Sequence, residues 1–282
     1  MTVWQTQRFV IDLRRPRVMG IVNVTPDSFS GASQPVDAGA AIAHCNELLR
    51  QGADILDIGG ESTRPGAQLL SAEEELRRVL PVLRHAVGLG VPVSVDTSQP
   101  GVMQAALDLG VDIVNDVRAL QREGALDVLA AHASAGVCLM HMQGEPATMQ
   151  VAPRYGDVVA DVLAFLAARH ALLRARGVAA DRIAIDPGIG FGKTVDHNLA
   201  LLRRQRELLV LGAPLLVGWS RKSTLGKLTG RALQERRDAS VAAALLAVQR
   251  GANIVRVHDV APTVDALAVW WAIEQPEQAR EP

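Results

Sequence analysis

Short apolar runs alternate with longer stretches of helical periodicity along almost the whole chain. Each run is rich in β-branched residues and bounded by turn residues, which is typical of strands buried on both faces of a parallel sheet. The predicted strands are residues 18–22, 55–58, 93–96, 111–114, 137–140, 182–185, 215–217 and 254–257. The predicted helices are residues 37–50, 72–87, 100–109, 124–135, 158–176, 198–209, 238–250 and 263–274.

Eight strand–helix units without a linker predict an α/β fold, a single (β/α)8 TIM barrel over residues 18–274. Residues 1–17 are expected to form an N-terminal extension or edge segment, and residues 275–282 a frayed polar tail. An open doubly wound sheet is the alternative, but it seldom sustains eight units, and no Gly-x-Gly-x-x-Gly follows the first strand. Pro81 predicts a kink or a break in its helix.

Composition narrows the possible functions. The chain has 282 residues, 49% of them hydrophobic, which indicates a globular protein with a large core. With 29 basic and 30 acidic residues, neither a nucleic-acid partner nor a membrane surface is expected. No apolar run reaches the roughly 18–20 residues of a membrane span, and the polar N-terminus lacks a signal core. Cys45 and Cys138 lack metal-site spacing and are interpreted as buried, reduced thiols of a cytoplasmic protein.

Residues 182–193 form the most informative junction between a strand and a helix. The apolar run ends in Asp186, and Pro187 and three glycines follow. A carboxylate at a strand tip beside a glycine-rich loop is typical of ligand sites in parallel α/β folds. The alternative is a tight turn whose acid caps the next helix. The same arrangement recurs along the chain, which favours the ligand site.

Polar residues follow nearly every predicted strand, and in a barrel these strand ends converge on one mouth. Asp96, Asn115 and Asp186 offer acceptors and an amide that match the amino-amide edge of a flat heterocycle, and Lys222 can reach a ring carbonyl or nitrogen. The whole set is Asn23, Glu61 to Arg64, Asp96, Asn115, His141, Asp186, Ser220 to Lys222, and Arg256 to His258.

A second group of strand-end residues suits phosphate. Arg256 and His258, together with Thr63 and Arg64, can donate to oxyanions. The amide oxygen of Asn23 can hold a hard cation.

Structural interpretations stand beside these functional ones. Asp96 can be the N-cap of the following helix, and Asn115 and Asp116 can be turn residues. Trp219 can belong to the barrel packing and not to a ligand platform. Arg221 and Lys222 can be a solvated basic pair. His141 is interpreted as a satisfied loop histidine and is kept out of the catalytic set.

The motifs together resemble the dihydropteroate synthase family. The resemblance extends from about residue 19 to residue 269 and combines eight short motifs in the same order, which makes it specific. These motifs are residues 23–30, 57–66, 94–97, 115–116, 140–144, 186–193, 220–223 and 256–260.

The resemblance implies a pterin-binding TIM barrel with transferase activity. Such an enzyme joins (7,8-dihydropterin-6-yl)methyl diphosphate to 4-aminobenzoate and releases dihydropteroate and diphosphate, a step of folate synthesis. It also implies Mg²⁺ as cofactor, held at Asn23, and a homodimer. The Ala-rich helix 238–250 and the pair Trp270-Trp271 are candidates for the dimer face, with ordinary packing as the alternative.

The resemblance also assigns roles to individual residues. The catalytic set is Asp96, Asp186, Lys222 and Arg256. The substrate-binding set is Thr63, Arg64, Pro65, Asp96, Asn115, Asp186, Ser220, Arg221, Lys222, Arg256 and His258.

One motif departs from the family. After Ser30 the family commonly continues Asp-Gly-Gly, whereas this chain continues Gly31-Ala32-Ser33. This departure leaves a catalytically silent pterin-binding paralogue as an alternative. A pterin-binding methyltransferase domain is a further alternative, but it would have no use for the loops at 62–65 and 220–222.

Overall fold

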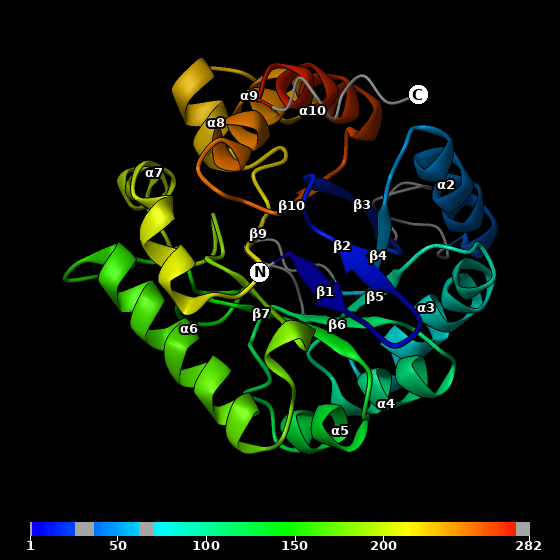
Figure 1. The fold of residues 1–282 in the computed structure, drawn as a ribbon. Helices are drawn as coiled ribbons and strands as arrows, with labels where there is room; N and C mark the ends of the chain where they lie inside the picture. The colour runs from blue at the N-terminus through cyan, green and yellow to red at the C-terminus, as the bar shows by residue number, and fades with distance from the viewer. Residues whose placement is uncertain (1, 26–36, 62–69, 275–282) are drawn as a thin grey trace.

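The structure, a computed structural model, describes residues 2–25, 37–61 and 70–274. In these ranges eight parallel strands are surrounded by helices (Figure 1). The strand order is β8-β7-β6-β5-β4-β3-β10-β9, so neighbours in sequence are neighbours in space. The predicted TIM barrel is therefore confirmed. The strands are β3 (Arg17–Asn23), β4 (Ile55–Gly59), β5 (Val93–Asp96), β6 (Ile113–Asp116), β7 (Gly136–Met140), β8 (Ile183–Asp186), β9 (Leu216–Val217) and β10 (Ile254–Val257).

Helices follow the strands and cover the outside of the barrel (Figure 1). The α-helices are α2 (Ala38–Arg50), α3 (Ala72–Val87), α4 (Pro100–Asp108), α5 (Ala125–Ala131), α6 (Val158–Ala175), α7 (Val195–Arg203), α8 (Ser223–Thr229), α9 (Arg237–Val248) and α10 (Val260–Glu274). The 3₁₀ segments in the described ranges are η1 (Ala180–Arg182), η2 (Gln205–Leu211) and η3 (Leu233–Glu235). No helix in these ranges is long and apolar enough to cross a membrane.

The barrel closes most weakly between β8 and β9. β9 has only two residues, and a single parallel bridge joins Ile185 to Leu215. The amide of Ile185 donates to the carbonyl oxygen of Pro214 over 2.9 Å. We call this junction the seam.

Pro81 does not interrupt α3, so the predicted break is wrong. The helix starts at an N-cap serine, Ser71, whose side chain accepts from the amide of Glu74, and it runs on to Val87. Proline leaves one backbone carbonyl without its helical donor. Val79, Val82 and Leu83 on either side of it are fully buried in the core, and their burial outweighs that loss.

Two further elements differ from the sequence prediction. The helix expected over residues 198–209 is divided into α7 and η2, and α8 was not expected at all. Both involve short segments of about two turns, for which apolar periodicity is a weak signal.

A small hairpin that the hydrophobic pattern did not predict lies across one end of the barrel (Figure 1). Its strands, β1 (Val3–Gln5) and β2 (Val10–Asp12), pair antiparallel, with Trp4 opposite Ile11. Trp4 is fully buried, and its Nε1 donates to the carbonyl oxygen of Arg182 over 3.0 Å. Together the hairpin and the inner faces of the strands form an apolar cluster, here called the base layer: Trp4, Ile11, Leu13, Met19, Ile55, Ile113, Cys138, Ala184, Leu216 and Ile254.

Candidate active site

Two residues further along the same strands, the inward-facing side chains are polar and no longer apolar. Successive strand residues alternate between faces, so a residue two positions after a base-layer residue again points inward. Ile55 is thus followed by Asp57, and Ile254 by Arg256. Asn115 and Asp186 follow Ile113 and Ala184 in the same way, and Asp96 is the register partner of Asn115 on β5. We call this set the polar layer: Asp57, Asp96, Asn115, Asp186 and Arg256.

Arg256 links the polar layer from the centre. Its Nε donates to Asp57 Oδ2 and its Nη2 to Asp96 Oδ2, each over 2.6 Å. Asn115 Nδ2 approaches the two oxygens of Asp57 at 3.4 and 3.3 Å. The structure therefore brings together Asp96, Asn115 and Arg256, as the sequence predicts.

Asp57 is a site residue that sequence reasoning missed. It is fully buried and contacts both Arg256 and Asn115. The available signal was an acid between Leu56 and Ile58 in an otherwise apolar strand, since a buried carboxylate requires a partner. Its place within the strand, away from the tip, hid it from a search restricted to strand ends.

The two acids assigned to the pterin have raised pKa values. Burial raises the pKa of Asp96 to about 7, although the nearby Arg256 opposes the shift. Burial raises the pKa of Asp186 to about 6, against the hydrogen bond from the amide of Gly188 and the charges of Lys222 and Lys193. Both carboxylates are thus poised to bind a ligand that brings N–H donors.

A tight turn at the end of β8 orients Asp186. The amide of Gly188 donates to Asp186 Oδ1 over 2.7 Å. Gly188 has φ +68°, and a side chain there would collide with the carbonyl oxygen of His141. Only glycine fits this backbone conformation and this approach. The turn therefore fixes the carboxylate without a helix cap.

Lys222 lies against the same turn. Its Nζ is 4.1 Å from the centroid of the Phe191 ring, a cation–π contact. A Cβ on Gly190 would come within 3.1 Å of Lys222 Cδ, so this glycine allows the lysine to lie flat against the backbone. Burial lowers the pKa of Lys222 to about 8, as does Arg256, while Asp186 and Asp96 oppose the shift.

Ser220 and His258 form a second pair near the mouth. The Ser220 hydroxyl oxygen accepts from the backbone amide of His258 over 3.1 Å and lies 2.9 Å from His258 Nδ1. Burial, followed by the charges of Arg256 and Arg221, lowers the pKa of His258 to about 3, so the ring is neutral. In the tautomer that carries its proton on Nε2, Nδ1 accepts from the Ser220 hydroxyl and Nε2 can donate to an anion.

The remaining predicted residues are placed differently. The guanidinium of Arg221 forms an ion pair with Asp259, with Nη2 2.7 Å from Oδ1, and not with the polar layer. Asn23 ends β3 beside Gly59 and is half-buried. Thr63, Arg64 and Pro65 lie outside the described residues, as does the Gly31-Ala32-Ser33 departure.

Several structural alternatives can now be decided. The N-cap of α4 is Gln99, so Asp96 is not the cap. Asp116 does organise a turn, because its carboxylate accepts from the amides of Arg118 and Leu120 over 2.8 and 2.7 Å. Trp219 is only 2% exposed and belongs to the packed core.

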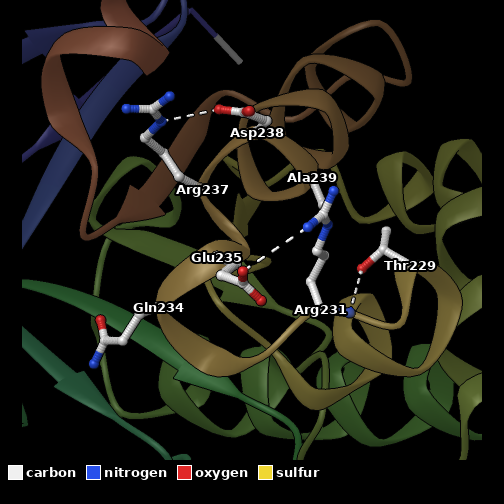
Figure 2. Close-up of a pocket in the computed structure, with 7 residues that line it drawn as sticks. All are labelled: Thr229, Arg231, Gln234, Glu235, Arg237, Asp238 and Ala239. Carbon is white, nitrogen blue, oxygen red and sulfur yellow. Dashed lines mark hydrogen bonds and ion pairs between the residues drawn. The ribbon is translucent and has the colours of Figure 1, made fainter.

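A separate surface hollow of about 530 Å³ lies among α8, η3 and α9 (Figure 2). Its charged residues pair locally: Arg231 lies 3.8 Å from Glu235, and Arg237 lies 2.9 Å from Asp238. No polar-layer residue lines it. We therefore place the candidate site at the polar layer and not in this hollow.

Comparison with known proteins agrees with this geometry. The model of the family described as "Pterin binding enzyme" matches residues 19–258. The dihydropteroate synthase of Neisseria meningitidis serogroup B is 57% identical over 277 residues, which cover 96% of this chain and 97% of that protein.

Solved structures show the same likeness. The Xanthomonas albilineans dihydropteroate synthase with 4-aminobenzoic acid has a TM-score of 0.88 at 51% identity, covering 94% of this chain and 96% of that one. The Burkholderia cenocepacia dihydropteroate synthase complexed with 7,8-dihydropteroate has a TM-score of 0.88 at 49% identity, covering 99% of each chain.

Proposed function

This chain belongs to the pterin-binding enzyme family, and from that premise we propose that its polar layer is the pterin pocket of a dihydropteroate synthase. The enzyme is a transferase that joins (7,8-dihydropterin-6-yl)methyl diphosphate to 4-aminobenzoate. Extensive identity with synthases favours this function over the silent paralogue and over the methyltransferase domain.

One observation supports the pterin pocket above all: Asp96, Asn115 and Asp186 lie together at the mouth end of β5, β6 and β8, where Asn115 and Asp186 are buried. The amino-pyrimidine edge of a pterin carries adjacent N–H donors and a carbonyl. A carboxylate can accept two of these N–H groups, and an asparagine amide can complete the edge. Lys222 then donates to a ring carbonyl or nitrogen.

The charges suit a reaction in which diphosphate leaves before the amine attacks. Departure of diphosphate puts positive charge on the pterin methylene, and the anionic forms of Asp96 and Asp186 favour that charge. Arg256 Nη1 makes no hydrogen bond within residues 2–25, 37–61 and 70–274, which supports a role for it, together with His258, in binding the oxyanions. The arylamine meets a reactive carbon, so no strong general base is required.

The residues on the aminobenzoate side remain part of the proposal. They are Thr63, Arg64, Pro65, Ser220 and Arg221, assigned through the family's motifs. The hydroxyl of Ser220 bonds His258, which ties this side to the diphosphate side.

Mg²⁺ is proposed at Asn23. Within the described ranges no three His, Cys, Asp or Glu residues are grouped to hold a metal ion. A single amide oxygen fits an ion held mainly by substrate phosphates and water, as Mg²⁺ commonly is. The ion would neutralise charge on the leaving diphosphate, while Asn23 supplies one ligand.

The decisive experiment combines the purified protein with Mg²⁺, the pterin diphosphate and 4-aminobenzoate. Dihydropteroate and diphosphate should form in equal amounts, and a chelator should abolish their formation. If the pterin diphosphate binds but no dihydropteroate appears, the protein is a silent paralogue.

We propose a homodimer through the outer face of α10. Val269 and Ile273, one helical turn apart, are 64% and 71% exposed. On α9, Leu246 is 40% exposed. A single large apolar patch on a protein surface commonly marks an interface. Val269→Glu with Ile273→Glu should convert the dimer to a monomer in sedimentation experiments, and a wild-type monomer would refute the proposal.

The cytoplasmic location is proposed as well. Cys45 and Cys138 are both buried and unpaired, which fits a reducing compartment. Fractionation of cells that express the full chain would test it.

A further inference from the structure

Lys193 is a buried lysine to which the proposed reaction assigns no role. The chain has three lysines, Lys193, Lys222 and Lys227. Lys193 is only 3% exposed, whereas lysines are almost never fully buried without a specific reason. Within the described ranges its ammonium has three polar contacts: it lies 2.9 Å from His141 Nδ1 and donates to the carbonyl oxygens of Phe191 and His141 over 3.0 and 3.3 Å.

These contacts connect the two loops that border Asp186. The backbone amide of His141 donates to the carbonyl oxygen of Asp186 over 3.0 Å. The amide of Phe191 donates to Gly188 over 3.1 Å, and Gly188 in turn donates to the Asp186 carboxylate. Lys193 therefore holds both ends of the turn that aims the Asp186 side chain.

The same turn supports Lys222. The Phe191 ring lies under the Lys222 ammonium, and the Phe191 carbonyl is bound by Lys193. A shift of that carbonyl would move the ring and the lysine above it. Lys193 thus acts on two pterin-facing groups, although the structure shows it bonded to neither.

Resting on the proposed function, we propose that Lys193 is a positioning residue for pterin binding: its ammonium fastens the 187–191 turn to His141 and so holds Asp186 and Lys222 in place. The contact with His141 also fixes the ring. Burial, together with Lys193, lowers the pKa of His141 to about 3, so the ring is neutral. Because an ammonium can only donate, Nδ1 accepts from Lys193 and the ring proton is on Nε2.

The charge of Lys193 matters as well as its hydrogen bonds. Burial lowers its pKa to about 7, Lys222 lowers it further, and Asp186 opposes the shift. In the described ranges Lys193 makes no ion pair within 4.0 Å, so Asp186 feels its charge at longer range. The titratable groups that face it are His141 after β7, Tyr155 before α6, Asp186 on β8 and Lys222 before α8.

The test measures binding of a 6-substituted pterin without diphosphate by calorimetry between pH 5 and 8. Lys193→Met should weaken binding at least about tenfold, because the turn loses the hydrogen bonds from a charged group. Loss of the cation should raise the pKa of Asp186, so the fall in affinity on acidification should begin at a higher pH than in the wild type. The KM for 4-aminobenzoate should change much less than the KM for the pterin.

Lys227→Met is the matched control, because it makes the same substitution at an exposed lysine and should leave affinity and pH profile unchanged. If Lys193→Met does not fold, Lys193→Gln keeps a donor without the charge and should show the same pH shift. Wild-type affinity and pH profile in the folded variants would overturn the inference. Failure of the wild type itself to bind the pterin would instead overturn the proposed function.

Discussion

The base layer and the polar layer occupy the same barrel, two residues apart along the same strands. In the base layer, Ile55 and Ile254 belong to the same apolar cluster as Trp4, and their side chains have no polar group that needs a hydrogen bond. In the polar layer, Asp57 and Arg256 form an ion pair over 2.6 Å, and removal of either residue would leave the charge of the other without its partner. The first region gains stability from burying apolar area. The second loses stability because its charges are buried away from water, and its charges are the groups that bind a ligand. We therefore expect substitutions in the base layer to reduce stability alone, and substitutions in the polar layer to reduce activity as well.

Arg256→Leu should have the largest effect. It leaves Asp57 and Asp96 buried without their cation, which costs about 3–5 kcal/mol of stability, and it removes an oxyanion donor, which costs about 10²–10³-fold in kcat. Chemical denaturation and steady-state kinetics measure the two effects. As control, Arg14→Leu breaks the exposed pair with Asp12 and should change stability by less than about 1 kcal/mol.

Trp4→Ala should come next and affect stability only. It leaves a cavity in the base layer and removes the hydrogen bond to Arg182, for a loss of about 3–5 kcal/mol. The kcat of the folded fraction should remain close to that of the wild type. A large fall in kcat at a temperature where the variant is fully folded would break the separation between the two layers.

Glu75→Gln should stabilise the protein in a pH-dependent way. Glu75 on α3 is fully buried, and neither of its carboxylate oxygens has a hydrogen-bond partner among residues 2–25, 37–61 and 70–274. Burial raises its pKa to about 7. A raised folded-state pKa means that the wild type loses stability as pH rises from about 4.5 to about 7. The variant should gain on the order of 2 kcal/mol at pH 8 and almost nothing at pH 4. Equal gains at both values would contradict the assignment.

Thiol labelling should show the smallest effect. Cys138 lies in the base layer, and burial raises the pKa of its thiol well above the ordinary value. Burial raises the pKa of Cys45 to about 12. Neither thiol should react with a maleimide in the native protein, whereas both should react in denaturant. Labelling at the rate of a free thiol would show that the layer opens.

Much of this arrangement followed from the sequence, because eight apolar runs place their following residues at one mouth. Asp96, Asn115 and Asp186 were found in that way. Asp57 was missed because it lies within a strand. Lys193 was missed because a lysine after glycines resembles a surface residue, and its burial depends on His141, some fifty positions earlier.

The N-terminal hairpin was missed for a related reason. Strands of three residues are too short to show alternation, and a lone hairpin is only marginally stable in water. Trp4 becomes ordered by entering a barrel built from the rest of the chain. Because the hairpin is stabilised by contacts with distant parts of the chain, its own sequence does not predict it.

Binding of the pterin should also affect the stability of the seam. Asp186 stands on the β8 side of it and Lys222 follows β9 on the other side. A pterin bound between them would join two edges that share a single bridge in the free protein. Local opening there should therefore be the cheapest fluctuation in the barrel. We expect the amide hydrogen of Ile185, which donates across the seam to Pro214, to exchange with deuterium early in the free protein and to become strongly protected by ligand.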